Sequence, residues 1–144
     1  MAINKVVHVK RTQEDAFRLF VDEMRRWWPN KDGKYTYGGD RAQDVFLEAR
    51  VGGRFYERFK DGEEYEIGRV TELQRPNHIV FTWGAGARGE GTTIVDVRFT
   101  PDGDGTRVEL EHRDIENMGA MAHSFGTGWD EVLGEYVRAA GEGK

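Results

Sequence analysis

Two glutamates and a histidine are the residues of this sequence best placed to do acid–base chemistry. In the alternating stretches of the chain, Glu57 shares its strand parity with Phe55 and Phe59 and so falls on their face. Glu66 and His112 fall on apolar faces of their own predicted strands by the same parity. A carboxylate or an imidazole among apolar groups must find a partner or shift its pKa, and such groups can move protons or orient a bound molecule. They are the candidates for the polar end of an apolar pocket.

The same three residues also have a purely structural interpretation. Glu57 or Glu66 can pair with an arginine at the sheet edge, and His112 can be a hydrogen-bonded core histidine. The arginines within reach are Arg54, Arg58 and Arg69. Geometry decides between the two interpretations, because an enzyme needs at least two pocket groups with separated pKa values within hydrogen-bond reach. Catalytic residues are therefore left unassigned at this point.

Metal and covalent chemistry find little support in the sequence. The histidines at 8, 78, 112 and 123 show no HxH, HxxxH or HExxH spacing, and cysteine is absent. There is no GxSxG motif, and the glycine-rich stretch GAGARGEG lacks the GK[ST] of a phosphate-binding loop. We predict no metal site and no cofactor, and we expect GAGARGEG to be a hairpin tip.

Length and charge narrow the function classes. The 144 residues fit one domain, residues 1–144, and the formal net charge of -5 repels phosphate backbones, so nucleic acid is not an expected partner. The N-terminal stretch MAINKVVHVKRT has no apolar run of the signal-peptide kind, and no stretch approaches the roughly 18 apolar residues of a membrane span. We expect a cytoplasmic protein without a membrane span.

The elements that must position the candidate residues follow from the hydrophobic periods. Residues 3–10 alternate as a strand, and Thr12 stands as the N-cap of a helix that begins near Gln13 and ends before Pro29. Residues 43–115 alternate with period two between turn signals, which predicts about six strands. A helical apolar stripe then closes the chain; it consists of Met118, Met121, Ala122, Phe125, Trp129, Val132, Leu133, Tyr136, Val137 and Ala140.

Aromatic side chains are abundant for so charged a sequence: four Trp, eight Phe and five Tyr. They form either an ordinary core or the wall of a ligand-sized cavity, reached through the loops 33–40 and 84–91. The glycines at 126 and 128 in the last helix indicate close packing, or passage of a ligand, beside Trp129. The predicted ligand-binding residues are Phe17, Phe20, Trp28, Phe55, Glu57, Glu66, Trp83, His112, Phe125 and Trp129.

Four stretches of the sequence carry a family resemblance, in this order: VGGRFYERFKDG, GRVTELQRPNHIVFTW, GTRVELEH and HSFGTGW. Together they resemble the SRPBCC, or START-like, superfamily, and within it the bacterial group named after the activator of the heat-shock-90 chaperone ATPase. The resemblance covers essentially the whole chain. It implies an α+β helix-grip fold, in which a curved antiparallel sheet of six to seven strands wraps around a long C-terminal helix and leaves a cavity between them.

The resemblance implies three functions. The first is binding of a small hydrophobic or aromatic molecule in the cavity, without catalysis. The second is an enzyme of the cyclase, aromatase or hydrolase type that uses the pocket Glu or His residues. The third is a co-chaperone that stimulates the heat-shock-90 ATPase; the eukaryotic activator has a separate N-terminal domain with an Asn- and Trp-rich contact motif, which this sequence lacks, so we expect no large stimulation. A homodimer is compatible with the sequence.

Overall fold

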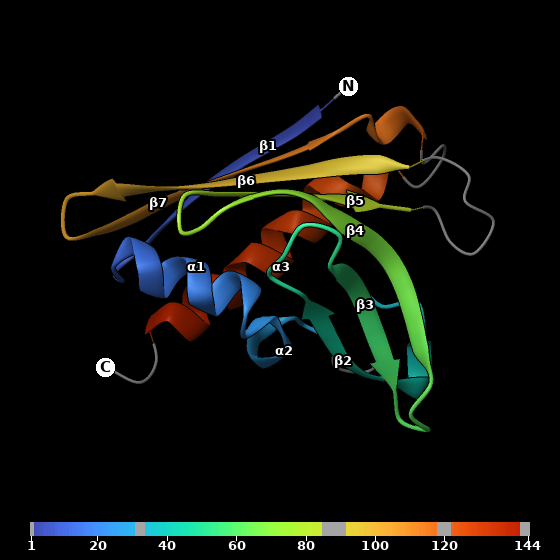
Figure 1. Cartoon of the computed structure of the whole chain (residues 1–144). Helices are drawn as coiled ribbons and strands as arrows, with labels where there is room; N and C mark the ends of the chain where they lie inside the picture. Colours follow the sequence, from blue (N-terminus) through green and yellow to red (C-terminus); the bar gives the residue numbers. More distant parts are fainter. Residues whose placement is uncertain (1, 31–33, 85–91, 118–121, 142–144) are drawn as a thin grey trace.

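The computed structural model describes residues 2–30, 34–84, 92–117 and 122–141. In these residues a first strand leads through two short helices into a run of further strands, and the chain ends in a long helix (Figure 1). The elements are β1 (Ala2–Val9), α1 (Gln13–Val21), α2 (Met24–Trp27), η2 (Gly39–Arg41), β2 (Ala42–Leu47), β3 (Arg54–Phe59), β4 (Glu64–Gln74), β5 (His78–Trp83), β6 (Thr93–Asp102), β7 (Gly105–Arg113) and α3 (Ala122–Gly141).

The described residues form one antiparallel sheet of seven strands in the order β1-β7-β6-β5-β4-β3-β2. Strands β2 to β7 are neighbours both along the chain and in the sheet, which confirms the predicted meander. The first strand joins at the far edge, where Val7 lies opposite Val108. The sheet curves around α3 as a half-barrel (Figure 1), so the α+β helix-grip fold expected from the resemblance is confirmed.

Strand alternation gives the sheet one apolar and one wet face. On β6, Val97 and Phe99 are buried, while Arg98 and Thr100 between and beyond them are exposed. Strand β7 follows the same period. Because successive side chains point to opposite faces, the apolar members of the meander line the concave side, where α3 packs.

A bulge in β4 bends the sheet. Phe55 of β3 pairs with Gly68, but the next residue, Tyr56, pairs with Glu66, so Ile67 is an extra residue on β4. Such an insertion bends the strand and increases its twist. Gly68 also allows a close approach, because a Cβ there would lie 1.7 Å from the carbonyl oxygen of Thr82. The long curved ribbon of β4 in Figure 1 follows this bend.

The N-terminal helical region divides in two, where the apolar period predicted one helix. Thr12 caps α1 as expected, its hydroxyl accepting a hydrogen bond from the backbone N–H of Asp15 at 3.2 Å. The helix then ends at Val21, and Glu23 has the non-helical angles φ -118° and ψ 28° before α2 begins. This break turns Trp27 into the core, where its indole N–H donates to the carbonyl of Leu19 at 2.8 Å.

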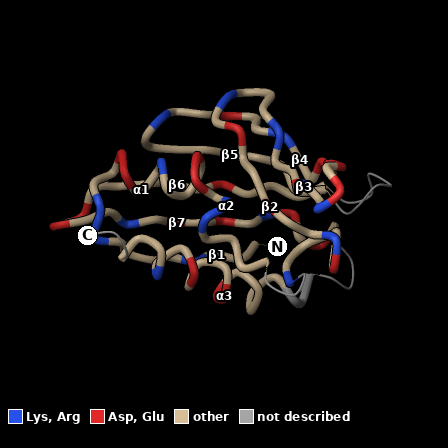
Figure 2. The backbone as a smooth tube through the Cα atoms, turned by 90° about the horizontal axis from the view of Figure 1, so that it is seen from below, with Lys and Arg blue, Asp and Glu red and all other residues tan. Residues whose placement is uncertain are grey.

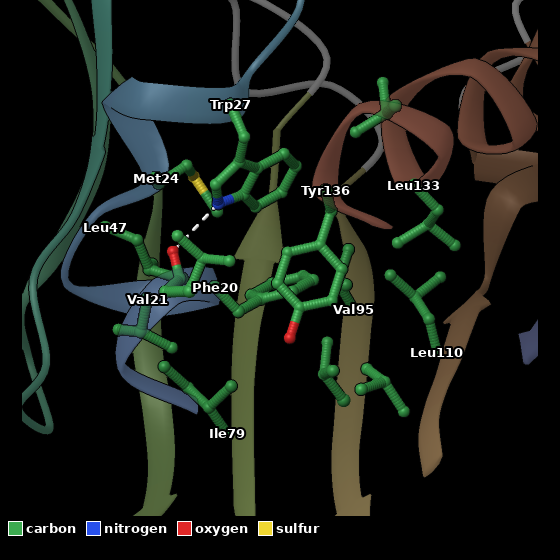
Figure 3. Packing of buried hydrophobic residues seen from close by; sticks show 14 of the residues in the cluster. Phe20, Val21, Met24, Trp27, Leu47, Ile79, Val95, Leu110, Leu133 and Tyr136 are labelled. Atoms are coloured by element: carbon green, nitrogen blue, oxygen red, sulfur yellow. Dashed lines mark hydrogen bonds between the residues drawn. The ribbon is translucent and has the colours of Figure 1, made fainter. Parts of the chain in front are cut away.

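Helix α3 fills the concave side of the sheet. Trp129, Val132, Leu133, Tyr136 and Ala140 of the predicted stripe are buried, and Phe125 is partly buried. Val137 is exposed, contrary to the prediction, and Met118 and Met121 lie outside the described residues. Figure 3 shows Tyr136 of α3 packed among the side chains of α1 and α2, and its hydroxyl donates to the carbonyl of Ala16 at 2.8 Å. No helix in the described part of the chain is long and apolar enough to cross a membrane.

Charges of both signs are mixed over the molecule. In Figure 2, Lys and Arg segments lie among Asp and Glu segments along the strands and helices. Many of them pair with a neighbour on the surface. Arg41, for example, lies 2.9 Å from Asp61 and 2.8 Å from Glu63.

Candidate functional site

A cavity of about 240 Å³ lies between α3, the end of β5 and the segment that connects α2 to η2. Nine residues line it: Trp28, Tyr35, Thr36, Tyr37, Trp83, Phe125, Gly128, Trp129 and Val132. Apart from the hydroxyls of one threonine and two tyrosines, the side chains of this wall are aromatic or aliphatic. The cavity is therefore an apolar site with a polar rim on one side.

Regular secondary structure positions most of the wall. Phe125, Trp129 and Val132 recur at helical spacing, so they lie on the one face of α3 that meets the sheet. Trp83 is the last residue of β5 and points to the same concave side. Trp28 precedes Pro29, which holds it in an extended conformation (ψ 125°) at the end of α2.

The rings of the wall pack against one another in tilted or edge-to-face arrangements. The ring centroid of Trp28 lies 6.1 Å from that of Trp83 and 6.2 Å from that of Trp129. The rings of Trp83 and Phe125 are 5.6 Å apart and nearly perpendicular, with an interplanar angle of 77°. These are the preferred separations of aromatic pairs. The rings support one another and leave apolar surface facing the cavity.

The three indole N–H groups of the wall are all bonded within the protein. Trp28 Nε1 donates to the carbonyl of Tyr35 at 3.0 Å, and Trp83 Nε1 donates to the hydroxyl of Tyr37 at 2.8 Å. Trp129 Nε1 donates to His112 Nδ1 at 3.0 Å. The tryptophans therefore offer a bound molecule their apolar faces rather than their donors.

His112 lies behind this wall in a fully satisfied network. An indole N–H can only donate, so His112 Nδ1 accepts from Trp129 and the ring proton is on Nε2. His112 Nε2 then donates to the hydroxyl of Thr93 at 2.7 Å, and Thr93 donates to the carbonyl of Trp83 at 3.0 Å. Burial lowers the pKa of His112 to about 4, so the ring is neutral near pH 7. The structural interpretation of His112 as a core histidine describes these contacts.

Glu57 is also buried, and it holds the segment that borders the cavity. Its side chain is 0% exposed, and its two carboxylate oxygens accept the backbone N–H groups of Tyr37 at 2.6 Å and Gly38 at 3.1 Å. Burial raises the pKa of Glu57, and the two hydrogen bonds offset part of that rise. Glu57 positions the cavity rim without lining the cavity.

The comparisons with known proteins agree with this architecture. Residues 10–140 match the family described as Activator of Hsp90 ATPase homolog 1-like protein. The chain belongs to this family. No curated protein matches the sequence.

Solved structures show the same fold over nearly the whole chain. A protein from Mesorhizobium loti is 13% identical with a TM-score of 0.74, and the match covers 100% of this chain and 99% of that one. The Aha1 dimer from Colwellia psychrerythraea is 19% identical with a TM-score of 0.72, covering 100% and 98%. The anthrahydroquino-gamma-pyrone synthase Txn09 is 28% identical with a TM-score of 0.67, covering 95% of each chain.

In this member of the Activator of Hsp90 ATPase homolog 1-like family, four of the predicted site residues meet at the cavity: Trp28, Trp83, Phe125 and Trp129. Phe55 lies directly behind them, with its ring 5.2 Å from that of Trp83, but it does not line the cavity. Strand and helix periods direct Phe55, Trp83, Phe125 and Trp129 to the concave side, and the extended residue Trp28 joins them at the end of α2. Their contact with a ligand stays a prediction.

Phe17 and Phe20 do not line the cavity, contrary to the sequence prediction. Both are fully buried on α1, and their rings lie 5.1 Å and 5.7 Å from that of Phe99 on β6. Phe20 also packs against Tyr136 at 5.1 Å, about two turns along α3 from Trp129. The helical period identifies the buried face of α1 correctly, but it carries no information about which part of the core that face meets.

Glu66 does not face the cavity, which corrects the prediction for this residue. It is exposed on β4 and pairs with Arg69 at 2.7 Å. Strand parity had placed Glu66 with Val70, but the extra residue Ile67 changes the alternation, and Ile67 and Val70 are the residues that join the core. A bulge therefore reverses the predicted face of Glu66.

Three lining residues that the sequence did not indicate are Tyr35, Thr36 and Tyr37. The sequence signalled this segment only as a glycine- and tyrosine-rich loop on the access path. Of the other predicted access loop, 84–91, residues 85–91 lie outside the described residues. No group of three or more potential metal ligands occurs in the residues that the structure describes.

Proposed function

We propose that this chain binds a small, uncharged molecule that contains an aromatic ring system, in the cavity between the sheet and α3. The observation that carries the proposal is the wall itself: an apolar cavity of about 240 Å³ whose three indole N–H groups are already bonded within the protein. Such a wall gains from covering its ring faces and offers no charge to neutralise.

Size limits the ligand. An engineered protein cavity of roughly 150 Å³ binds benzene, whereas drug-sized ligands occupy pockets of about 300–1,000 Å³. The cavity of about 240 Å³ lies between these values and suits a molecule of about two fused rings. The hydroxyls of Tyr35, Thr36 and Tyr37 border one side, so a single polar substituent on the ligand would face that rim.

A structural neighbour supports an aromatic ligand. Txn09, 28% identical over 95% of this chain, is named as an anthrahydroquino-gamma-pyrone synthase, and that name describes a fused-ring compound. The cavity is less suited to acid–base catalysis. None of the nine lining residues is an acid or a histidine, and both ring nitrogens of His112 are already bonded to Trp129 and Thr93.

A titration with 2-naphthol, an uncharged bicyclic alcohol, tests the proposal. We expect saturable quenching of tryptophan emission, confirmed by calorimetry. Gly128→Leu should weaken binding by at least about tenfold, because the new side chain starts beside Tyr35 and extends into the cavity.

Gly134→Leu is the matched control. Gly134 is exposed on the same helix, and a Cβ there would meet nothing within 4 Å. Both variants replace a helical glycine by leucine, so their helix propensities rise equally. Equal affinities in the two variants would contradict binding in this cavity.

A further inference from the structure

Residues 34–38, called the strap below, border the cavity and are held at two ends. Tyr35, Thr36 and Tyr37 of the strap line the cavity. One end is bonded to Glu57 in the sheet, and the other end is bonded to Glu131 on α3. The two sets of contacts differ in burial.

The sheet end of the strap is held by buried polar contacts. Glu57 accepts both backbone N–H groups described above and has no exposed surface. The hydroxyl of Tyr37 donates to the carbonyl of Gly84 at 3.1 Å while it accepts from Trp83. Releasing this end would leave a buried carboxylate without its donors, which is costly in an apolar environment.

The helix end of the strap is held at the surface. The hydroxyl of Tyr35 is hydrogen-bonded to Glu131, an interaction that raises the pKa of Tyr35 to about 12 and lowers that of Glu131. Lys34 Nζ also lies 3.6 Å from Glu131, with side chains 67% and 50% exposed. Water can replace such contacts, and exposed ion pairs contribute little. Trp28 Nε1 is also hydrogen-bonded to the carbonyl of Tyr35 at this end.

Backbone strain lies at the same end. Tyr35 has φ +55°, in the left-handed region that residues other than glycine rarely adopt. A conformation of this kind persists only where its surroundings hold it. The ring of Tyr35 lies across from Gly128, where a Cβ would be 3.4 Å from Tyr35 Cε1. Movement of Tyr35 away from α3 would therefore relieve strain and open the cavity between the strap and the helix.

We infer that the strap opens at the Tyr35–Glu131 end, hinges at the Glu57 end, and so admits the ligand between Tyr35 and Gly128. Opening breaks the contacts of Tyr35 with Glu131 and Trp28 and that of Lys34 with Glu131, and it leaves those of Tyr37 and Gly38 with Glu57 intact. The role of the opening in ligand entry rests on the proposed function; the opening itself does not.

Hydrogen exchange of the ligand-free protein tests the opening. Tyr35→Phe removes the hydrogen bond at the helix end, so the indole N–H of Trp28 should exchange about 3- to 10-fold faster, the change expected for one net hydrogen bond. Glu131→Gln keeps an acceptor oxygen but removes its charge, so it should speed the same exchange by a smaller factor. The indole N–H of Trp129 and the amides of Tyr37 and Gly38 should exchange at unchanged rates. Glu135→Gln is the matched control, because Glu135 pairs with Arg138 one turn further along α3.

Stopped-flow binding of 2-naphthol tests the role in ligand entry. In Glu131→Gln, whose side chain does not line the cavity, the association and dissociation rate constants should rise by the same factor as the Trp28 exchange rate. The Kd of this variant should stay unchanged, because the contact is weakened equally in the free and the bound closed states. Tyr35→Phe changes a lining residue and serves the exchange measurement alone. Unaltered Trp28 exchange in both variants would overturn the inference. Faster exchange in a protein that binds no 2-naphthol would support the opening and reject the proposed function.

Discussion

His112 shows how one donor can decide the protonation state of a whole network. The N–H of Trp129 fixes Nδ1 as an acceptor, and each later bond to Thr93 and Trp83 then has only one direction. A second proton on the ring would place an N–H against the indole N–H and a charge in a site with 0% exposure. Folding and protonation of His112 therefore compete.

That competition predicts a pH dependence of stability. The pKa of His112 is about 4 in the folded protein against an ordinary value of 6.5, so the unfolded chain binds the proton more tightly. The stabilisation from the neutral ring is fully present above pH 6.5. It is lost as the pH falls from 6.5 to about 4, by a total of about 3 kcal/mol. Urea unfolding of the wild type and His112→Leu between about pH 7 and pH 4 measures it.

His112→Leu removes the titrating group, so the difference in unfolding free energy between the two proteins should shrink as the pH falls. The leucine variant should be the less stable protein at neutral pH, because Trp129 and Thr93 lose their buried partner. Parallel pH curves for the two proteins would show that His112 is not the group responsible.

The bend of β4 depends on a glycine. At Gly68 a Cβ would lie 1.7 Å from the carbonyl oxygen of Thr82 on the neighbouring strand, and backbone cannot move aside as the end of a long side chain can. We expect Gly68→Ala to lower the free energy of unfolding by at least about 3 kcal/mol, measured by chemical denaturation. Gly134→Ala, with nothing within 4 Å of its Cβ, should instead raise it by up to about 1 kcal/mol.

The same bulge shows where strand alternation fails to predict which residues of an element are buried. Period two identified the buried residues of β6 and β7, because both strands pair without interruption through Val97 and Leu110. In β4 the extra residue Ile67 reverses the faces, and strict alternation therefore misplaced Glu66. Gly68 is a local signal of such a bulge, but the position of the extra residue depends on the pairing with β3.

At the scale of the molecule, the cavity-lining residues that the sequence predicted correctly are mainly those on regular helices and strands. Trp83, Phe125 and Trp129 follow from strand and helix periods and from their order in the chain. Tyr37 could not be placed in this way. It is held by Trp83, 46 residues away, and by Glu57, 20 residues away, and contacts at such separations have no local pattern.

Because the cavity joins the sheet, α3 and the strap, a ligand should stabilise the whole domain. A ligand at 100 times its Kd adds about 2.7 kcal/mol to the free energy of unfolding, and each kcal/mol raises the Tm of a domain of this size by about 2–4 °C. Saturating 2-naphthol should therefore raise the Tm of the wild type and of Gly134→Leu by about 5–10 °C, measured by circular dichroism.

Gly128→Leu should behave differently in the same experiment. Its side chain occupies the cavity, so the Tm without ligand should be equal to or above that of the wild type, and 2-naphthol should leave it unchanged. A ligand-induced increase in Tm that is lost only when Gly128→Leu fills the cavity places the ligand between α3 and the strap. A ligand-induced increase of the same size in Gly128→Leu would place the binding of 2-naphthol elsewhere on the protein.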